Sequence, residues 1–169
     1  AQGAKLILPG VGAFDSAMNR LHALHLVDVL AERALAARVP VLSICLGMQL
    51  MTRGSEEGSL PGLGWFQADT VRFRMPMEAR SLRLPHMGWN VIRPARPDPL
   101  LTGLDEDSRF YFVHSYHVRC QDRSQVLATA HYGIEFDAAI VHGNLAGTQF
   151  HPEKSHRYGL RLLSNFLAA

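Results

Sequence analysis

The sequence predicts an α/β fold, in which helices pack on a central mixed sheet. Short apolar runs alternate with segments whose apolar residues recur at helical spacing, which is typical of layered α/β domains. These segments are not separated by a low-complexity linker, so nothing divides the chain into parts. The length of 169 residues suits a single domain over residues 1–169, large enough to bury roughly 70% of its unfolded surface.

The first third of the chain predicts two strands and two helices. In chain order these are a strand at residues 5–8, a helix at 14–38, a strand at 41–44 and a helical turn at 48–51. The first strand stops at a glycine-rich turn, residues 9–12, and Asp15 or Ser16 is the expected cap of the helix that follows. The second strand runs through Cys45 into the second helix without a break.

The rest of the chain predicts short strands and a closing helix. The expected strands are residues 70–73, 90–92, 110–118, 126–130, 138–141 and 146–150. Strands so short, with turns between them, favour mixed or antiparallel pairing. The closing helix spans residues 158–167, with Ser155 as its expected N-cap.

Composition excludes several classes of protein. The formal net charge of +2 and the scattered basic residues argue against binding to nucleic acid or to a membrane surface. The longest apolar runs are interrupted by charged residues or His, so we expect no membrane span. Cys45 and Cys120 form neither a CxxC motif nor a disulfide framework, which favours a reducing cytoplasm.

Cys45 occupies a position that suits a nucleophile. A residue on a tight turn from strand to helix is exposed above the sheet, and the next backbone N–H is free to stabilise an oxyanion. The helix behind it favours the thiolate, and Gly47 supplies a small neighbour. The alternative is that Cys45 is a small core residue, which is the usual fate of a free cysteine.

The segment His151-Pro152-Glu153 supplies the partners that such a nucleophile needs. Side chains two residues apart at the end of a strand project to the same side. A carboxylate at Glu153 can then hold one nitrogen of His151 while the other faces a thiol. The chain has nine histidines, so a chance match is the alternative reading.

Other candidate sites are weaker. The glycine-rich turn at residues 9–12 lacks the spacing of a nucleotide-binding loop, and offers instead backbone N–H groups to an oxyanion. No HExxH motif or Cys/His cluster predicts a metal, and no cofactor is implied. On a strand, His114 and His117 face opposite sides. Ser115 lies outside any GxSxG motif, so a serine nucleophile is not expected.

Together these motifs resemble the class I (triad) glutamine amidotransferases. The elbow around Cys45 and residues 147–153 match the two hallmark motifs of that family in its chain order. More narrowly, five segments resemble the glutaminase subunits of imidazole glycerol phosphate synthases: residues 8–14, 44–50, 85–90, 111–116 and 154–155. The resemblance implies a flavodoxin-like three-layer fold with a central mixed sheet.

The resemblance also implies a reaction and a partner. Cys45 would attack the amide carbon of L-glutamine to form a thioester, with His151 as base and Glu153 orienting it. Ammonia would then pass through a tunnel to a separate (β/α)₈ cyclase subunit, in a heterodimer that serves histidine biosynthesis.

The same resemblance assigns the remaining site residues. The backbone N–H groups expected to form the oxyanion hole belong to Leu46 and to Val11 or Gly12. The residues expected to hold the glutamine are Gln49, Glu57, Ser115 and Tyr116. The residues expected to face the cyclase are Met87, Gly88, Trp89, Asn90 and Lys154.

The sequence departs from the family pattern in two places. Ser43 stands where a glycine is usual, and because it is small we expect the elbow to survive. The chain starts at Ala1, and the strand, glycine-rich loop and helix with which family members begin are not in it. We therefore expect an amino-terminally truncated domain, lacking the first strand and helix, with an open sheet edge and low solubility.

Three alternative functions remain open. A paralogous amidotransferase supplies nitrogen for surface-polysaccharide sugars, and residues 51–58 and 115–118 have some likeness to that branch. A catalytically silent binding subunit is the second alternative, although Cys45, His151 and Glu153 are all present. A cysteine peptidase with the same triad is the third.

Overall fold

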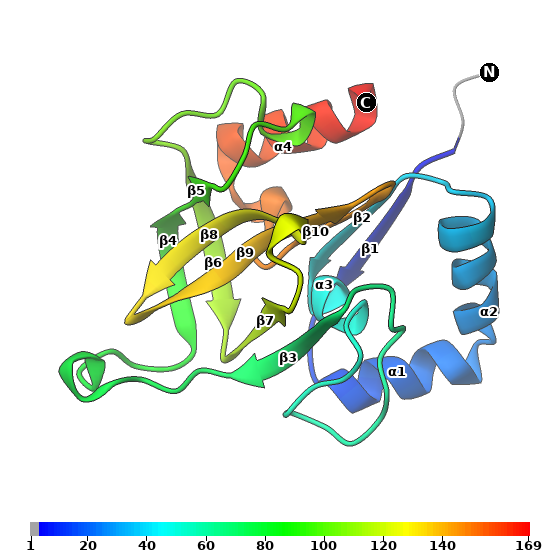
Figure 1. Cartoon of the computed structure of the whole chain (residues 1–169), viewed down its shortest axis with the longest axis horizontal. Helices are drawn as coiled ribbons and strands as arrows, with labels where there is room; N and C mark the ends of the chain where they lie inside the picture. The colour runs from blue at the N-terminus through cyan, green and yellow to red at the C-terminus, as the bar shows by residue number, and fades with distance from the viewer. Residues whose placement is uncertain (1–3) are drawn as a thin grey trace.

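A mixed sheet forms the middle of three layers in the computed structural model, which describes residues 4–169 (Figure 1). Its strands follow the order β1-β2-β10-β9-β7-β3, while β8 pairs with β9 and β5 pairs with β8. The bounds of these strands are β1 Leu6–Gly10, β2 Val41–Cys45, β3 Ala68–Arg72, β5 Arg93–Pro94, β7 Tyr116–Cys120, β8 Val126–Tyr132, β9 Ile134–His142 and β10 Leu145–Thr148. The predicted α/β class with a mixed sheet is confirmed.

The sheet has a parallel part and an antiparallel part. β1, β2 and β10 are parallel, whereas β9 pairs antiparallel with β10, β8 and β7, and β7 does so with β3. A separate antiparallel ribbon joins β4 (His86–Val91) to β6 (Arg109–His114). The mixed or antiparallel pairing predicted for the short strands of the later part of the chain is therefore confirmed.

Helices cover both faces of the parallel part. Leu42 and Ile44 of β2 lie in one apolar cluster with Leu162 of α4 (His156–Ala168), whereas Val41 lies in another with Met48 of α3 (Leu46–Leu50). This alternation follows from the two-residue period of a strand, and β2 is buried throughout because both of its faces are covered.

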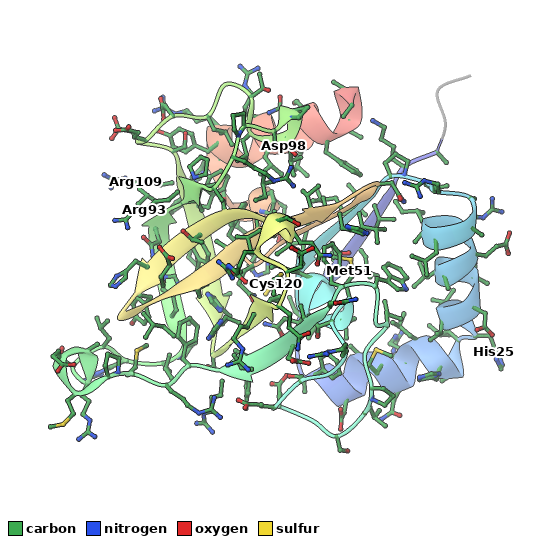
Figure 2. All side chains as sticks on the ribbon, viewed as in Figure 1. His25, Met51, Arg93, Asp98, Arg109 and Cys120 are labelled. Atoms are coloured by element: carbon green, nitrogen blue, oxygen red, sulfur yellow. The ribbon has the colours of Figure 1, made fainter. Side chains whose placement is uncertain are left out.

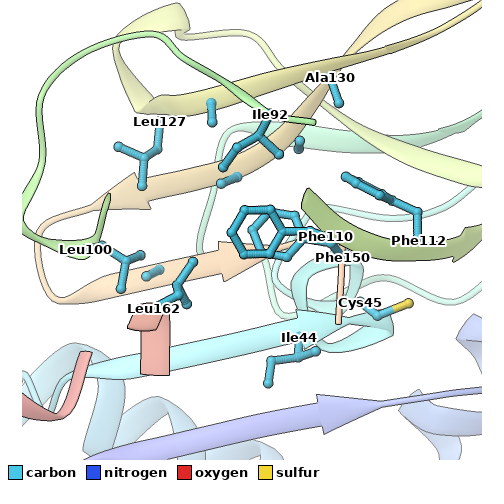
Figure 3. Close-up of a cluster of buried hydrophobic side chains, with 14 of the residues drawn as sticks. Ile44, Cys45, Ile92, Leu100, Phe110, Phe112, Leu127, Ala130, Phe150 and Leu162 are labelled. Atoms are coloured by element: carbon cyan, nitrogen blue, oxygen red, sulfur yellow. The ribbon is translucent and has the colours of Figure 1, made fainter. Parts of the chain in front are cut away.

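Aromatic rings fill the core between the ribbon and the sheet. The rings of Phe110 and Phe150 lie 4.2 Å apart in the first cluster, and Cys45 stands at its border (Figure 3). The strand end that carries Cys45 is therefore embedded in a packed core.

The helix expected at residues 14–38 is wrong as a single element. The structure divides it into α1 (Phe14–Ala23), α2 (Leu26–Ala31) and a π-helical turn, Glu32–Ala36. The break falls at His25, whose φ is +53°, and its side chain lies at the outer corner between α1 and α2 (Figure 2). No Gly or Pro marks this position, so the uninterrupted apolar periodicity concealed the break.

The predicted cap of the first helix is wrong, whereas that of the closing helix is confirmed in position. Ala13 is the N-cap residue of α1, and Asp15 instead accepts backbone N–H groups from Ser59 and Leu60. Ser155 stands at the N-cap of α4, as expected, although its side chain makes no capping bond there.

The strand expected at residues 110–118 is interrupted at Ser115. β6 ends at His114 and β7 begins at Tyr116, and the Ser115 carbonyl accepts the Phe73 N–H at 3.2 Å. The bend turns His114 and His117 toward the same Phe73 ring, at centroid distances of 5.2 and 4.7 Å. The expectation that these two histidines face opposite sides is therefore wrong.

The remaining helices are single 3₁₀ turns: Met77–Ala79, Pro99–Leu101, Arg123–Gln125 and Pro152–Lys154. None of the helices within residues 4–169 combines the length and the apolar character that a bilayer-spanning helix requires.

Candidate active site

Cys45 lies on a strained elbow between β2 and α3. Its backbone has φ +53° and ψ −110°, a conformation that non-glycine residues rarely adopt. The turn is closed by main-chain contact, because a Cβ on Gly47 would meet the Leu8 carbonyl oxygen at 2.0 Å. Only glycine fits at that position, and the predicted nucleophile elbow is present.

Ser43 lies in β2, two residues before Cys45. It is fully buried in β2, and its hydroxyl donates to the Met51 sulfur at 3.2 Å. A serine in place of the usual glycine therefore leaves the elbow geometry in place, as expected.

Burial favours the protonated form of the Cys45 thiol. Burial raises the pKa of Cys45 to about 11, and the Leu46 N–H, at the start of the helix, only partly opposes that effect. The expectation that the helix start favours the thiolate is therefore outweighed by desolvation, which α3, with five residues, cannot offset. A nucleophilic sulfur here requires a base.

His151 is held as such a base would be. Its Nδ1 and a Glu153 carboxylate oxygen are 2.7 Å apart, while its Nε2 is buried without a hydrogen-bond partner among the described residues. The pair does not form as an extended strand end, because β10 stops at Thr148 and Pro152–Lys154 is a 3₁₀ turn. The 3₁₀ turn of the backbone brings the side chains of His151 and Glu153 together.

A buried serine fastens the backbone of His151. The Ser155 hydroxyl donates to the His151 carbonyl at 2.6 Å and accepts the Tyr111 N–H at 3.0 Å. The His151 N–H in turn donates to the Tyr111 carbonyl at 2.9 Å. Three bonds therefore fix the histidine against strand β6.

One cavity joins Cys45 to His151. Its volume is about 350 Å³, which suits a small amino acid. The residues that line it are Val11, Gly12, Cys45, Leu46, Gln49, Glu57, Pro85, Val113, His114, Ser115, Tyr116 and His151. Except for Glu153, which lies behind His151, every residue expected in the triad, the oxyanion hole and the substrate site lines this cavity.

The expected oxyanion-hole segments meet at one end of this cavity. Leu46 follows Cys45, and the loop holding Val11 and Gly12 follows β1, whose last residue pairs with Cys45. Gly12 has φ +100°, a backbone conformation that favours glycine.

Two of the expected substrate residues also support the fold. A Glu57 carboxylate oxygen accepts the Phe14 N–H at 2.9 Å, at the start of α1. Gln49 donates through Nε2 to the Tyr116 carbonyl at 3.2 Å and to the Gln149 side-chain oxygen at 3.1 Å.

Sequence reasoning missed two buried polar residues at the site. Gln149 donates through Nε2 to the Cys45 sulfur at 3.7 Å, and His114 lines the cavity. Strand spacing gave no signal for Gln149, because β10 ends at Thr148 and Gln149 lies beyond it. No local signal marked His114, because its position depends on the bend at Ser115.

The residues expected to face a partner divide between two faces of β4. Met87 and Trp89 are exposed, Trp89 stacks on His156 at 5.2 Å, and the Lys154 ammonium lies 6.0 Å from the centre of the Tyr111 ring. Gly88, with φ +130°, and Asn90 are half-buried. The Asn90 side chain turns away from Met87 and Trp89 and donates to the His131 carbonyl at 2.9 Å.

Metal ligation finds no support in the side chains of residues 4–169. No group of three or more His, Cys, Asp or Glu there is arranged to hold an ion. The arrangement suits a covalent reaction on sulfur assisted by a histidine.

The comparison with family models places the chain in a class. The model described as "Glutamine amidotransferase class-I" matches residues 4–169. The chain therefore belongs to the class-I glutamine amidotransferase family.

Within that family the chain is similar to one kind of subunit. It is 47% identical over 167 residues to "Imidazole glycerol phosphate synthase subunit HisH 2" of Methanococcus maripaludis, covering 99% of this chain and 81% of that one. It is 49% identical over 166 residues to the protein of the same name in Pseudomonas aeruginosa, covering 98% and 81%.

A solved structure confirms the fold alone. A glutamine amidotransferase from Thermotoga maritima is 17% identical and superposes with a TM-score of 0.63, over 95% of this chain and 60% of that one. The three-layer α/β fold expected for class I glutamine amidotransferases is thereby confirmed.

Proposed function

We propose that this single domain hydrolyses L-glutamine to glutamate and ammonia through a thioester on Cys45. One observation carries the proposal: the buried His151 has Nδ1 on Glu153 and a free Nε2, and it shares a small cavity with a cysteine on a strained elbow. This is the arrangement by which a histidine activates a thiol nucleophile.

The first half of the reaction forms the thioester. His151 Nε2 takes the thiol proton as the Cys45 sulfur attacks the amide carbon, and the negative charge moves to the amide oxygen. The Leu46 N–H and that of Val11 or Gly12 stabilise this oxyanion, and each such donor contributes about 10²–10³ in rate. Collapse breaks the C–N bond, and the amine leaves as ammonia with the proton from His151.

The second half restores the enzyme. His151 now takes a proton from a water molecule as that water attacks the thioester carbon. The attack forms a second oxyanion. Collapse releases glutamate and returns the proton to the sulfur. Glu153 holds the imidazole orientation in both halves and stabilises the imidazolium that forms.

The cavity supports a small amino acid as substrate. Glu57 offers a carboxylate for the α-ammonium group, while Gln49, Ser115 and Tyr116 line the wall beside it. A volume of about 350 Å³ open to one side favours free glutamine over a peptide.

We also propose that the ammonia is passed to a (β/α)₈ cyclase subunit for imidazole glycerol phosphate synthesis in the histidine pathway. Names of the relatives, which call them subunits of that synthase, support this acceptor. The exposed Met87 and Trp89, beside Lys154, would form the docking face of the heterodimer with its ammonia tunnel. Two free thiols suit a reducing cytoplasm.

The test is ammonia release from L-glutamine, with and without the (β/α)₈ cyclase and its ligand. Wild type should release ammonia and Cys45→Ala should not. Cys120→Ala should behave as wild type, because Cys120 is buried but does not line the cavity. Release that rises with the cyclase would support the whole proposal. Absence of release from folded, cyclase-bound protein would refute the glutaminase and leave a binding subunit.

A different acceptor is the second candidate. Several relatives carry the number 1 or 2 in their names, which indicates more than one such protein in an organism. Release that needs Cys45 but ignores the histidine-pathway cyclase would move the acceptor to surface-polysaccharide synthesis.

A further inference from the structure

Two buried histidines outside the triad link strand β4 to the wall of the cavity. His86 Nδ1 and His114 Nε2 are 3.0 Å apart, and His114 Nδ1 lies 2.7 Å from the Tyr116 carbonyl oxygen. On the other side, the Asn90 amide nitrogen lies 3.3 Å from His86 Nε2. The proposed chemistry uses none of these three side chains.

The partners fix the direction of every hydrogen bond in this chain. A carbonyl oxygen only accepts, so His114 Nδ1 carries the proton and His114 Nε2 accepts from His86 Nδ1. His86 Nε2 then accepts from the Asn90 amide group, whose other N–H donates to His131 and whose oxygen accepts the Val91 N–H. Both histidines are therefore neutral Nδ1–H tautomers.

The chain of hydrogen bonds ends at the Tyr116 carbonyl, which also bonds to Gln49 in the cavity wall. The Tyr116 carbonyl accepts from Gln49 as well as from His114, and Gln49 continues to Gln149, which donates to the Cys45 sulfur. Tyr116 and Gln49 both line the cavity. A change in the His114 bond therefore acts on the pocket wall through the shared carbonyl.

The geometry points to His86 and His114 as positioning residues for glutamine: their one-directional hydrogen bonds hold the Tyr116 carbonyl, and with it Gln49, in the shape that binds the substrate. This inference rests on the proposed glutaminase function. Neither ring takes part in the reaction, since His86 lies outside the cavity and His114 has both nitrogens engaged. Burial supports it, because it lowers the pKa of His86 to about 4 and keeps that ring neutral.

The decisive variants replace His86 either by a ring that forms no hydrogen bond or by an amide that can donate one. His86→Phe preserves the stacking of His86 on Phe112 and Tyr132, at 4.8 and 4.2 Å, and removes the chain. His86→Asn restores a donor near the Nδ1 position. His117→Phe is the matched control, because His117 is buried against the same Phe73 ring but, among residues 4–169, its side chain bonds only to the neighbouring Val118 carbonyl.

Steady-state glutaminase kinetics should separate positioning from general stability. His86→Phe should raise KM for glutamine roughly five- to tenfold, the effect of one lost hydrogen bond, with kcat within about threefold of wild type. His86→Asn should recover most of that loss, and His117→Phe should leave KM within about twofold. An unchanged KM in His86→Phe, or an equal rise in His117→Phe, would overturn the inference.

Nitrogen-15 NMR of protein labelled at its histidines tests the direction of these hydrogen bonds without an activity assay. Both His86 and His114 should give the signals of neutral Nδ1–H tautomers at pH 7, and an Nε2–H tautomer at either position would overturn the inference. Wild-type protein without Cys45-dependent hydrolysis would refute the proposed function instead, while the NMR result would still decide the hydrogen-bond direction.

Discussion

The protonated state of Cys45 gives the sharpest prediction. Burial raises the pKa of the Cys45 thiol from an ordinary value of 9.0 to about 11. Each pKa unit changes the thiolate population tenfold, so at pH 7.5 the thiolate fraction falls from about 3% to about 0.03%. In the absence of substrate, Cys45 should react with iodoacetamide about 100-fold more slowly than an exposed thiol.

Peptide-resolved mass spectrometry after timed labelling measures this rate at Cys45. The rate should climb tenfold per pH unit from pH 6 to about pH 10, with no plateau in between. Cys120 provides an internal comparison, because burial raises its pKa to about 12 and it should label still more slowly.

A plateau with a midpoint below pH 8 would refute this reasoning. It would mean that Cys45 and His151 rest as a thiolate–imidazolium pair, and that the free Nε2 already carries a proton. The proposed mechanism would then begin from an ion pair instead of a proton transfer.

Three further predictions test the elbow, the serine fastening and the buried histidines. Gly47→Ala should lower the glutaminase activity about 10²-fold or more, because the added Cβ would meet the Leu8 oxygen at 2.0 Å and displace Cys45. Gly54→Ala is the control, because the nearest neighbour of its Cβ would be 3.9 Å away. Equal activities of the two variants would contradict the reasoning. Ser155→Ala leaves the half-buried Tyr111 N–H unpaired and removes the buried bond to the His151 carbonyl, so we expect a loss of about 2 kcal/mol and a Tm about 5 °C lower by calorimetry. An unchanged Tm would contradict this. Burial lowers the pKa of His114 from 6.5 to about 3. Below pH 6.5 the unfolded chain therefore binds more protons at this residue than the folded protein does, and the free energy of unfolding decreases as the pH is lowered from 6.5. The urea midpoint should therefore fall less between pH 7 and pH 5 in His114→Phe than in wild type, and parallel curves would refute that assignment.

Residue spacing predicted those features of the candidate site whose determinants are local. The contact of His151 with Glu153 joins residues two positions apart, and the elbow at Cys45 has Gly47 beside it, although the turn closes against the distant Leu8. Apolar patterns likewise located most strands and the closing helix, because a strand buried on both faces, such as β2, is a continuous apolar run and a helix buried on one face is periodic.

Other features depend on contacts that spacing does not encode. The break at His25 interrupts a continuous apolar pattern, and the bend at Ser115 turns His114 into the cavity. The Cys45 pKa is set by desolvation from residues distant in sequence, which outweighs the local helix start. The sequence-based grouping of Asn90 with Trp89 also ignored the strand alternation that sends Asn90 to the histidines.

The glycines around Cys45 fix the position of its sulfur through the backbone alone. Gly47 lies against the Leu8 carbonyl, and a Cβ on Gly10 would meet the Gly47 nitrogen at 2.9 Å. The sulfur is thus placed by contact of backbone with backbone, and not by the shape of large side chains. Replacement of core side chains should therefore disturb the position of the sulfur less than the addition of one methyl group at Gly10 or Gly47.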